Sequence, residues 1–275
     1  MKYQLFSATG CHRCGIIKKY MDQNRIVYDE QDIKAKGKDA FKSFYKENRR
    51  DILRGLEGIE FPILYTGEKI FQGVGVVLSY LIADEKLSSF VKRSELSHGW
   101  ISGINICSWP LTDEYAFLKL LRILKEQGLR IELEADGRHP RLLGTIIKDG
   151  LVDRLIFLLR GPVELYASIT GMPLDEKNLS QSLSLLTPEL EYKIVVPVSS
   201  FIQKSGDTGS LTPQEAALAA RFAYDATGSK THPFFIRPEN CVKNTALTMP
   251  ALFKYRTMCR PFMVKCDILN SDTIF

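Results

Sequence analysis

The sequence Cys11-His12-Arg13-Cys14 most narrows the folds and the chemistry open to this chain. It lies between an apolar strand-like run at residues 3–6 and a helical pattern. The apolar positions of that pattern are Ile16, Ile17, Tyr20 and Met21. Cys11 is therefore expected at a helix N-terminus, where unpaired backbone N–H groups and the helix dipole stabilise a thiolate. Cys14, one turn into the helix, is placed to resolve a mixed disulfide formed on Cys11.

Two other interpretations of the cysteine pair are a structural thiol pair and half of a zinc site. A zinc site needs about four ligands, and the sequence contains no second CxxC or CxxH. Positive charge close to the cysteines also favours redox chemistry, and it comes from His12, Arg13, Lys18 and Lys19. A metal or iron–sulfur carrier that uses Cys11 and Cys14, and a non-catalytic interaction module, remain as alternatives.

Strand and helix patterns continue after this first helix. The sequence predicts a strand at 26–29, a charged helix within 35–56, and strands at 59–65 and 69–73. Pro62 follows Phe61 at the opening of a strand, a position where proline is often cis.

Residues 1–84 resemble glutaredoxins and related small thioredoxin-fold proteins. The resemblance rests on Cys11-His12-Arg13-Cys14, on the Phe61-Pro62 step and on Gly73-Val74-Gly75 before a helix. It implies a thioredoxin fold with Pro62 cis beside the dithiol, Cys11 as nucleophile and Cys14 as resolving thiol. It also implies that His12, Arg13, Phe61, Pro62 and Gly73 contact the substrate.

The chain departs from glutaredoxins at three positions around the cysteines. His12-Arg13 replaces the usual Pro-Tyr, Glu60-Phe61 replaces the usual Thr-Val, and the glycine pair at 73–75 is interrupted and lacks the following aspartate. These departures predict that protein disulfides are better substrates than glutathione mixed disulfides. Glutathione remains a candidate electron donor.

Composition excludes several classes of function. The 275 residues are enough for two domains, and 45% hydrophobic content is ordinary for a globular protein. A net charge of +5 is too small to indicate nucleic-acid binding, and Arg49-Arg50 and Lys92-Arg93 are interpreted as solvated surface. Without a signal peptide, a membrane span or a disulfide framework among the six cysteines, the sequence predicts a cytoplasmic protein with no membrane partner.

Residues 1–85 are predicted to form one domain, residues 86–98 a polar linker and residues 99–275 a second domain. Predicted strands in the second domain lie at 104–107, 129–133, 155–159, 192–197 and 234–236. Predicted helices lie at 114–127, 140–148, 179–186 and 213–227. Alternation of strands and helices predicts parallel βα units in an open sheet or a partial barrel.

This second half resembles the distal part of radical S-adenosylmethionine proteins, in particular the activating enzymes of anaerobic ribonucleotide reductase. The resembling segments are residues 129–140, 150–153, 160–171 and 195–197. The resemblance implies a radical-SAM-like partial barrel. By analogy only, it also implies a partner in nucleotide reduction, such as a reductase.

Such enzymes hold a [4Fe–4S] cluster on a CxxxCxxC loop, which this sequence lacks. Cys107-Ser108-Trp109-Pro110 also replaces the Gly-Gly-Glu-Pro segment that would hold the cofactor, and Trp109 is expected to fill part of the vacated cleft. We therefore expect neither an iron–sulfur cluster nor S-adenosylmethionine. The remaining thiols are interpreted as packed side chains, with secondary redox or metal use left open; they are Cys107, Cys241, Cys259 and Cys266.

The sequence thus predicts an α/β protein, with an N-terminal thioredoxin (glutaredoxin-like) fold and a C-terminal parallel βα partial barrel. The predicted function is thiol–disulfide exchange, in which Cys11 and Cys14 reduce a disulfide of a partner protein. The second domain is expected to bind that partner or to position the first domain.

Overall fold

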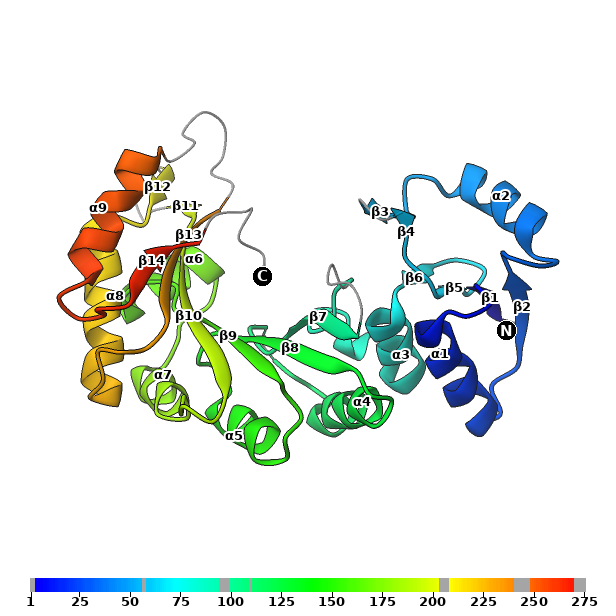
Figure 1. The fold of residues 1–275 in the computed structure, drawn as a ribbon, viewed down its shortest axis with the longest axis horizontal. Helices are drawn as coiled ribbons and strands as arrows, with labels where there is room; N and C mark the ends of the chain where they lie inside the picture. The colour runs from blue at the N-terminus through cyan, green and yellow to red at the C-terminus, as the bar shows by residue number, and fades with distance from the viewer. Residues whose placement is uncertain are drawn as a thin grey trace. The chain divides into compact units, whose positions relative to one another are not determined.

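A computed structural model describes residues 3–55, 58–93, 99–108, 110–202, 208–239 and 248–269 (Figure 1). The chain divides into two compact units, Met1–Ile131 and Glu132–Phe275. Trp109 and Cys241 lie outside the described residues, as does the 94–98 part of the predicted linker. The domain boundary predicted at residues 86–98 concerns independent folding, and it stays a prediction.

The first unit contains a four-stranded sheet of order β2-β1-β5-β6. Its strands are β1 (Tyr3–Ser7), β2 (Tyr28–Asp32), β5 (Ile63–Tyr65) and β6 (Ile70–Gln72). Strand β1 pairs parallel to β2 and antiparallel to β5, which pairs antiparallel to β6. The first unit also contains the helices α1 (His12–Gln23), α2 (Lys38–Glu47) and α3 (Val74–Ala83). Two short strands, β3 (Arg54–Gly55) and β4 (Gly58–Ile59), pair with each other.

Apolar side chains predicted on one face of α1 are buried there; they are Ile16, Ile17, Tyr20 and Met21. A second core lies between α2 and the sheet, where the Phe44 ring stacks on Phe6 with 4.4 Å between the ring centroids. These two cores hold α1 and α2 in place, and α1 carries the cysteine pair.

Both elements predicted within residues 26–56 differ from the structure. The helix expected within 35–56 is shorter, because α2 ends at Glu47 and Ile52 turns inward to join the core. The strand expected at 26–29 begins only at Tyr28, because Arg25 adopts a positive φ of 55° and the chain is still turning there. As a result, Val27 remains 70% exposed.

The first unit continues beyond α3 through a 3-10 turn, η1 (Asp84–Leu87), to β7 (Trp100–Asn105) and α4 (Glu114–Glu126). Backbone hydrogen bonds connect the two sides of this segment, from Asn105 N to Phe90 O at 2.8 Å and from Lys92 N to Gly103 O at 2.7 Å. Helix α4 buries the predicted apolar face, which consists of Phe117, Leu120, Leu121 and Leu124.

A six-stranded sheet has the order β14-β13-β10-β9-β8-β7. Its further strands are β8 (Arg130–Ala135), β9 (Arg154–Leu158), β10 (Glu191–Val198), β13 (Phe234–Pro238) and β14 (Cys266–Ile268). The pairs β8–β9, β9–β10, β10–β13 and β13–β14 are all parallel. The prediction of parallel βα units is confirmed at this level, and the sheet is consistent with a partial α/β barrel.

Helices of the second unit are α5 (Pro140–Lys148), α6 (Tyr166–Thr170), α7 (Glu176–Leu183), α8 (Pro213–Thr227) and α9 (Met249–Cys259). Shorter elements are η2 (Val163–Leu165) and the paired strands β11 (Ser200–Ile202) and β12 (Thr208–Ser210). Figure 1 shows α5, α7, α8 and α9 along the same outer face of the strands. Across the described ranges, no helix has the length and apolar character needed to cross a membrane.

Local signals explain why α5 and α8 occupy the residues predicted for them. Each helix begins with a proline in its first turn, where the missing N–H costs nothing. Thr212 and Glu215 form a reciprocal capping box at the start of α8, and Gly228 ends this helix in the left-handed conformation.

Candidate functional site

The cysteine pair lies at the N-terminus of α1, as predicted. Cys11 is the N-cap residue, with φ −81° and ψ 108°, and its Sγ accepts a hydrogen bond from the backbone N–H of Cys14 at 3.2 Å. The Cys14 thiol donates a second hydrogen bond to the same sulfur, with 2.6 Å between the two Sγ atoms. Both cysteines are free thiols in this structure.

The two thiols have opposite electrostatic environments. The hydrogen bond from the Cys14 thiol is the main cause that lowers the pKa of Cys11 to about 6. Partial burial opposes this shift, while the backbone N–H groups of Cys14 and Arg13 and the Arg13 charge support it. Cys14 is 1% exposed, and its hydrogen bond to Cys11 together with burial raises its pKa. Cys11 is therefore the thiolate at neutral pH, and Cys14 holds the proton.

The two residues between the cysteines differ in their exposure to solvent. His12 is exposed, whereas the half-buried Arg13 donates one hydrogen bond to Glu60 Oε1 at 2.7 Å and another to the Trp100 carbonyl at 2.8 Å. Lys18 and Lys19, predicted to add positive charge, hydrogen-bond to Glu30 at 2.9 Å and to Gln127 at 3.3 Å.

Glu60 connects this loop to two other parts of the first unit. Its carboxylate accepts from Arg13 and also from Arg93 Nε, which lies 3.3 Å from Oε2. Gly73, the residue before α3, has a φ of +89°, and a Cβ built on it would lie 3.1 Å from Glu60 Oε1. Gly73 is thus required both by its backbone conformation and by the close approach of the carboxylate.

Sequence reasoning missed the pairing of Glu60 with Arg93. The interpretation of Arg93 as solvated surface is wrong, because its side chain is only 21% exposed and is ion-paired. The sequence feature that could have indicated an ion pair is the carboxylate at position 60, immediately before Phe61-Pro62. The partner could not be identified from spacing, because 33 positions separate the two residues.

Phe61 and Pro62 lie immediately before β5. Their peptide bond is cis, as predicted, and the Pro62 carbonyl accepts a hydrogen bond from Gly73 N at 2.9 Å. Phe61 is half-buried, and its ring lies edge-on to Phe41 with 5.3 Å between centroids. The structure therefore connects Arg13 and Gly73 through Glu60, while Phe61 packs on α2. The substrate-contact roles of His12, Arg13, Phe61, Pro62 and Gly73 stay predictions.

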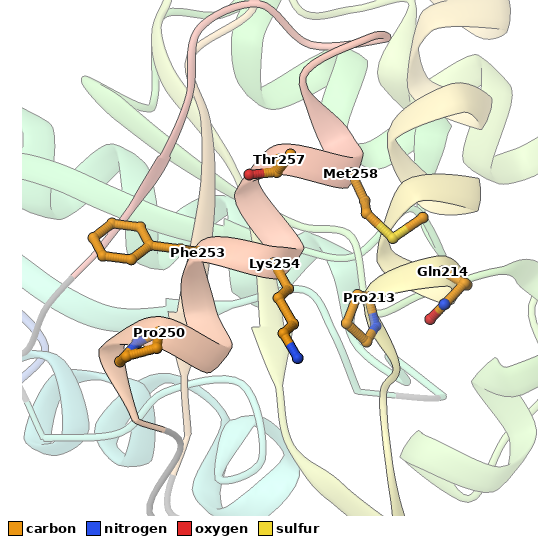
Figure 2. A pocket seen from close by; sticks show the side chains of 7 residues that line it. All are labelled: Pro213, Gln214, Pro250, Phe253, Lys254, Thr257 and Met258. Carbon is orange, nitrogen blue, oxygen red and sulfur yellow. The ribbon is translucent and has the colours of Figure 1, made fainter.

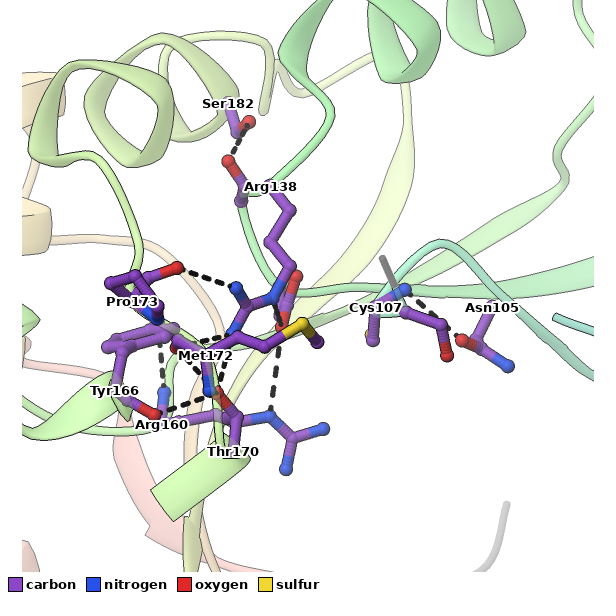
Figure 3. Close-up of polar contacts among 12 residues, drawn as sticks. Asn105, Cys107, Arg138, Arg160, Tyr166, Thr170, Met172, Pro173 and Ser182 are labelled. Carbon is purple, nitrogen blue, oxygen red and sulfur yellow. Dashed lines mark hydrogen bonds and ion pairs between the residues drawn. The ribbon is translucent and has the colours of Figure 1, made fainter. Parts of the chain in front are cut away.

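A second polar cluster follows strands β8 and β9 in the second unit (Figure 3). The buried Asp136 carboxylate accepts from Arg138 Nε at 3.0 Å, and Arg160 Nε lies 4.0 Å from the same oxygen. Burial raises the pKa of Asp136, and the charges of Arg138 and Arg160 oppose the rise. Arg138 also donates to the Pro173 carbonyl and to Thr170 Oγ1, at 2.8 and 2.6 Å. These contacts therefore hold the segment between β9 and α7 against the end of β8.

The other cysteines occupy three different environments. Cys107 is half-buried after β7, and its backbone N–H donates to Asn105 Oδ1 at 3.1 Å. Cys259 and Cys266 are buried, at 0% and 1% exposure. A hydrogen bond to Cys266, together with burial, raises the pKa of Cys259. These two thiols therefore lie next to each other inside the second unit, in keeping with their interpretation as packed side chains.

The structure also contains two pockets, which are lined by other residues. A cavity of about 340 Å³ lies between the start of α8 and α9 (Figure 2). It is lined by Pro213, Gln214, Pro250, Phe253, Lys254, Thr257 and Met258. A groove of about 200 Å³ lies in the first unit between α1 and α4. Within the described ranges, no group of three or more His, Cys, Asp or Glu side chains is arranged to hold a metal ion.

Comparison with solved structures finds distant similarities, whereas the two sequence comparisons find none. No protein-family model matches the chain, and no curated protein sequence matches it. A solved domain of pyruvate-formate lyase-activating enzyme from Bacteroides vulgatus ATCC 8482 is similar to the C-terminal part, with 14% sequence identity and a TM-score of 0.43. The similarity covers 62% of this chain and 99% of that domain. At this distance it does not assign an activity to the chain.

This finding corrects the expectation about cofactors. The similar domain belongs to an activating enzyme of the radical S-adenosylmethionine family, which uses an iron–sulfur cluster and S-adenosylmethionine. The expectation that this chain uses neither is therefore withdrawn. It rested on the missing CxxxCxxC loop and on the replaced Gly-Gly-Glu-Pro segment, and that loop is only one arrangement of cluster ligands.

Proposed function

We propose that this protein is a thiol–disulfide oxidoreductase, with Cys11 as the attacking thiol and Cys14 as the resolving thiol. The observation that carries the proposal is the asymmetry of the pair. Cys11 is partly exposed and has a pKa of about 6, while Cys14 is buried and has a raised pKa. An accessible thiolate beside a protonated partner is the arrangement that thiol–disulfide exchange needs.

The reaction proceeds through two exchange steps. The Cys11 thiolate attacks one sulfur of a partner disulfide, a mixed disulfide forms, and the other partner sulfur leaves as a thiolate that takes up a proton. Cys14 then loses its proton and attacks Cys11 Sγ, which lies 2.6 Å away in the reduced structure. The Cys11–Cys14 disulfide forms, and the second partner sulfur departs. Two electrons have passed from the dithiol to the partner.

Turnover requires reduction of the Cys11–Cys14 disulfide by an external thiol reductant. Either a dithiol protein or two molecules of glutathione supply the two electrons, and the reductant becomes a disulfide in return. Cys11, the more exposed of the two sulfurs, is the one that an incoming thiolate attacks.

The folds of the two halves form part of this proposal. A thioredoxin (glutaredoxin-like) fold for the first half is supported by the sheet order β2-β1-β5-β6 and by the cysteine pair between β1 and α1. A radical-SAM-like partial barrel for the second half is supported by the parallel six-stranded sheet. In this proposal the second half binds or positions a protein that carries the target disulfide.

A stoichiometric exchange experiment tests the proposal. The reduced full-length chain is mixed with an oxidised protein substrate, and the disulfides of both are mapped by mass spectrometry. We expect the substrate to gain two thiols while one Cys11–Cys14 disulfide forms per chain. A substrate that stays oxidised while Cys11 and Cys14 stay reduced would contradict the proposal and favour the interaction module. Iron and sulfide bound by Cys11 and Cys14 would favour the carrier.

A further inference from the structure

The Glu60 carboxylate is ion-paired with two guanidinium groups, and one of them belongs to Arg13 of the cysteine loop. Arg13, which lies between Cys11 and Cys14 in the sequence, donates to Oε1 at 2.7 Å, and Arg93 donates to Oε2 at 3.3 Å. The Glu60 side chain is 13% exposed, so both ion pairs are largely withdrawn from solvent. Each carboxylate oxygen therefore has a cationic partner, and no oxygen is left to bind a further cation as strongly.

The N-terminus of α3 adds a third attraction for negative charge. Both carboxylate oxygens lie within 3.2 Å of the position that a Cβ on Gly73 would take, and Gly73 is the N-cap residue of this ten-residue helix. The first N–H groups of a helix lack partners within the helix, and its dipole favours an anion at this end. Two arginines and a helix N-terminus thus converge on one carboxylate, which belongs to the chain itself.

We propose that Glu60 fills a carboxylate-binding site beside Cys11, and that it thereby excludes thiols and disulfides that carry a free carboxylate near the sulfur. The substrate class of the dithiol is then the disulfide of a folded or extended polypeptide, whose backbone offers no free carboxylate close to the sulfur. This inference rests on the proposed function and assigns its specificity to a single side chain.

The exclusion follows from charge and from hydrogen bonding. An incoming carboxylate must displace Glu60 from both arginines, or it must remain close to Glu60 as an unpaired like charge. Displacement by a shift of the backbone is resisted, because the Glu60 carbonyl accepts a hydrogen bond from Gln72 Nε2 at 3.2 Å. Gln72 is itself buried and bonds the backbone of Leu53 at 2.9 and 3.0 Å. The backbone that presents Glu60 is therefore fixed in place.

A pair of substrates with and without free glutathione carboxylates tests the inference. One is a peptide in mixed disulfide with glutathione, and the other is the same peptide in mixed disulfide with glutathione diethyl ester. The wild-type chain is expected to reduce the glutathione form no faster than the ester. A clear preference of the wild-type chain for the charged form overturns the proposal, whatever the variants do.

The variant Glu60→Gln keeps the size of the side chain and removes its charge. We expect the rate ratio, charged form over ester, to rise about tenfold, as when one charge-assisted hydrogen bond becomes available. Glu68→Gln is the matched control, because it removes the same charge from an exposed residue in the turn between β5 and β6; its ratio should stay at the wild-type value. A ratio in Glu60→Gln equal to that of the wild type contradicts the proposal.

Binding of S-methylglutathione supplies a readout that does not depend on exchange chemistry, because this thioether cannot react with Cys11. Calorimetry on the full-length chains should show about tenfold tighter binding to Glu60→Gln than to the wild type. Adding Arg93→Gln to that variant should remove most of the gain. If these binding changes appear while none of the chains reduces a disulfide, the specificity site stands and the proposed function fails. Equal binding to all the chains overturns the specificity site.

Discussion

In the part of the chain that the structure describes, two pairs of cysteines each bring their thiols within hydrogen-bonding distance, and the pairs lie at opposite ends of their helices. Cys11 is the N-cap of α1, whereas Cys259 is the last residue of α9. Cys11 is partly exposed and has a pKa of about 6, while burial and a hydrogen bond to Cys266 raise the pKa of Cys259. Backbone N–H groups at the start of α1 support the Cys11 thiolate, whereas burial and the hydrogen bond to Cys266 keep Cys259 protonated, so the same residue type has opposite properties at the two sites.

The contrast shows that proximity of two cysteines does not by itself produce an accessible thiol with a lowered pKa. Both pairs place one thiol within hydrogen-bonding distance of the other. Only in the pair at α1 is the acceptor sulfur accessible, and there backbone N–H groups and Arg13 support its charge. In the pair at α9 and β14 both thiols are covered by the core of the second unit. We therefore propose thiol–disulfide exchange for the first pair and packing for the second.

The largest expected effect concerns disulfide reduction by matched substitutions in the two pairs. Cys11→Ser should reduce the rate of protein-disulfide reduction to background, because the attacking sulfur is gone. Cys259→Ser should leave the rate within about twofold of the wild type, because a thiol that is 0% exposed does not meet the substrate. Steady-state assays on folded variants measure both rates. Equal losses in both variants would remove the distinction between the pairs.

A smaller effect is expected when the hydrogen bond within the reactive pair is removed. Cys14→Ala deletes the main cause of the lowered pKa of Cys11, which should rise towards its ordinary value of about 8.5. The thiolate fraction at pH 7 would then fall from about nine-tenths to a few per cent. The pH dependence of thiolate absorbance reports this change. An unchanged pKa of Cys11 would show that the helix N-terminus alone sets its acidity.

The two serine variants should rank in the opposite order when folding stability is measured instead of activity. Cys259→Ser places a hydroxyl among apolar groups and should lower the free energy of unfolding by about 1–2 kcal/mol. Cys11→Ser should change it by less than about 0.5 kcal/mol, because serine is a favoured N-cap residue and the site is partly exposed. Denaturant unfolding measures both values. Greater destabilisation by Cys11→Ser would contradict the packing role assigned to Cys259.

The smallest expected effect concerns the charge beside the reactive pair. Arg13→Gln should raise the pKa of Cys11 slightly, because the Arg13 charge is one of the weaker causes of its lowering. Arg13→Lys keeps that charge but loses the two-pronged donation to Glu60 and Trp100, so it should leave the pKa nearly unchanged. Titration of both variants separates charge from geometry. A larger shift in the lysine variant would assign the effect to backbone displacement.

Sequence patterns predicted elements best where local signals agree. Helices α5 and α8 occupy their predicted residues because proline and capping residues fix their ends. Cys11 at the N-cap of α1 was predictable for a similar reason, since an apolar strand ends just before it and helical spacing begins just after it. These features depend on a few neighbouring residues rather than on the tertiary structure.

Elements that depend on distant contacts were missed. Helix α9 has apolar side chains on its exposed face, Phe253 and Met258, as well as buried ones, so its pattern shows no single apolar stripe. The short strand β14 exists through its pairing with β13. The Glu60 site needs Arg93, and only the fold brings these two residues together. Spacing along the chain carries no information about any of these contacts.

Site-resolved alkylation across pH tests the central claim most directly. The reduced chain is labelled briefly with iodoacetamide between pH 4 and pH 10, and each cysteine is quantified by mass spectrometry. Because the thiolate is the reactive form, Cys11 labelling should rise through a midpoint near pH 6 and level off above pH 7. Cys259 and Cys266 should remain unlabelled until the chain is unfolded. A Cys11 midpoint near the ordinary value of about 8.5, with labelling of Cys259 in the native state, would contradict the account.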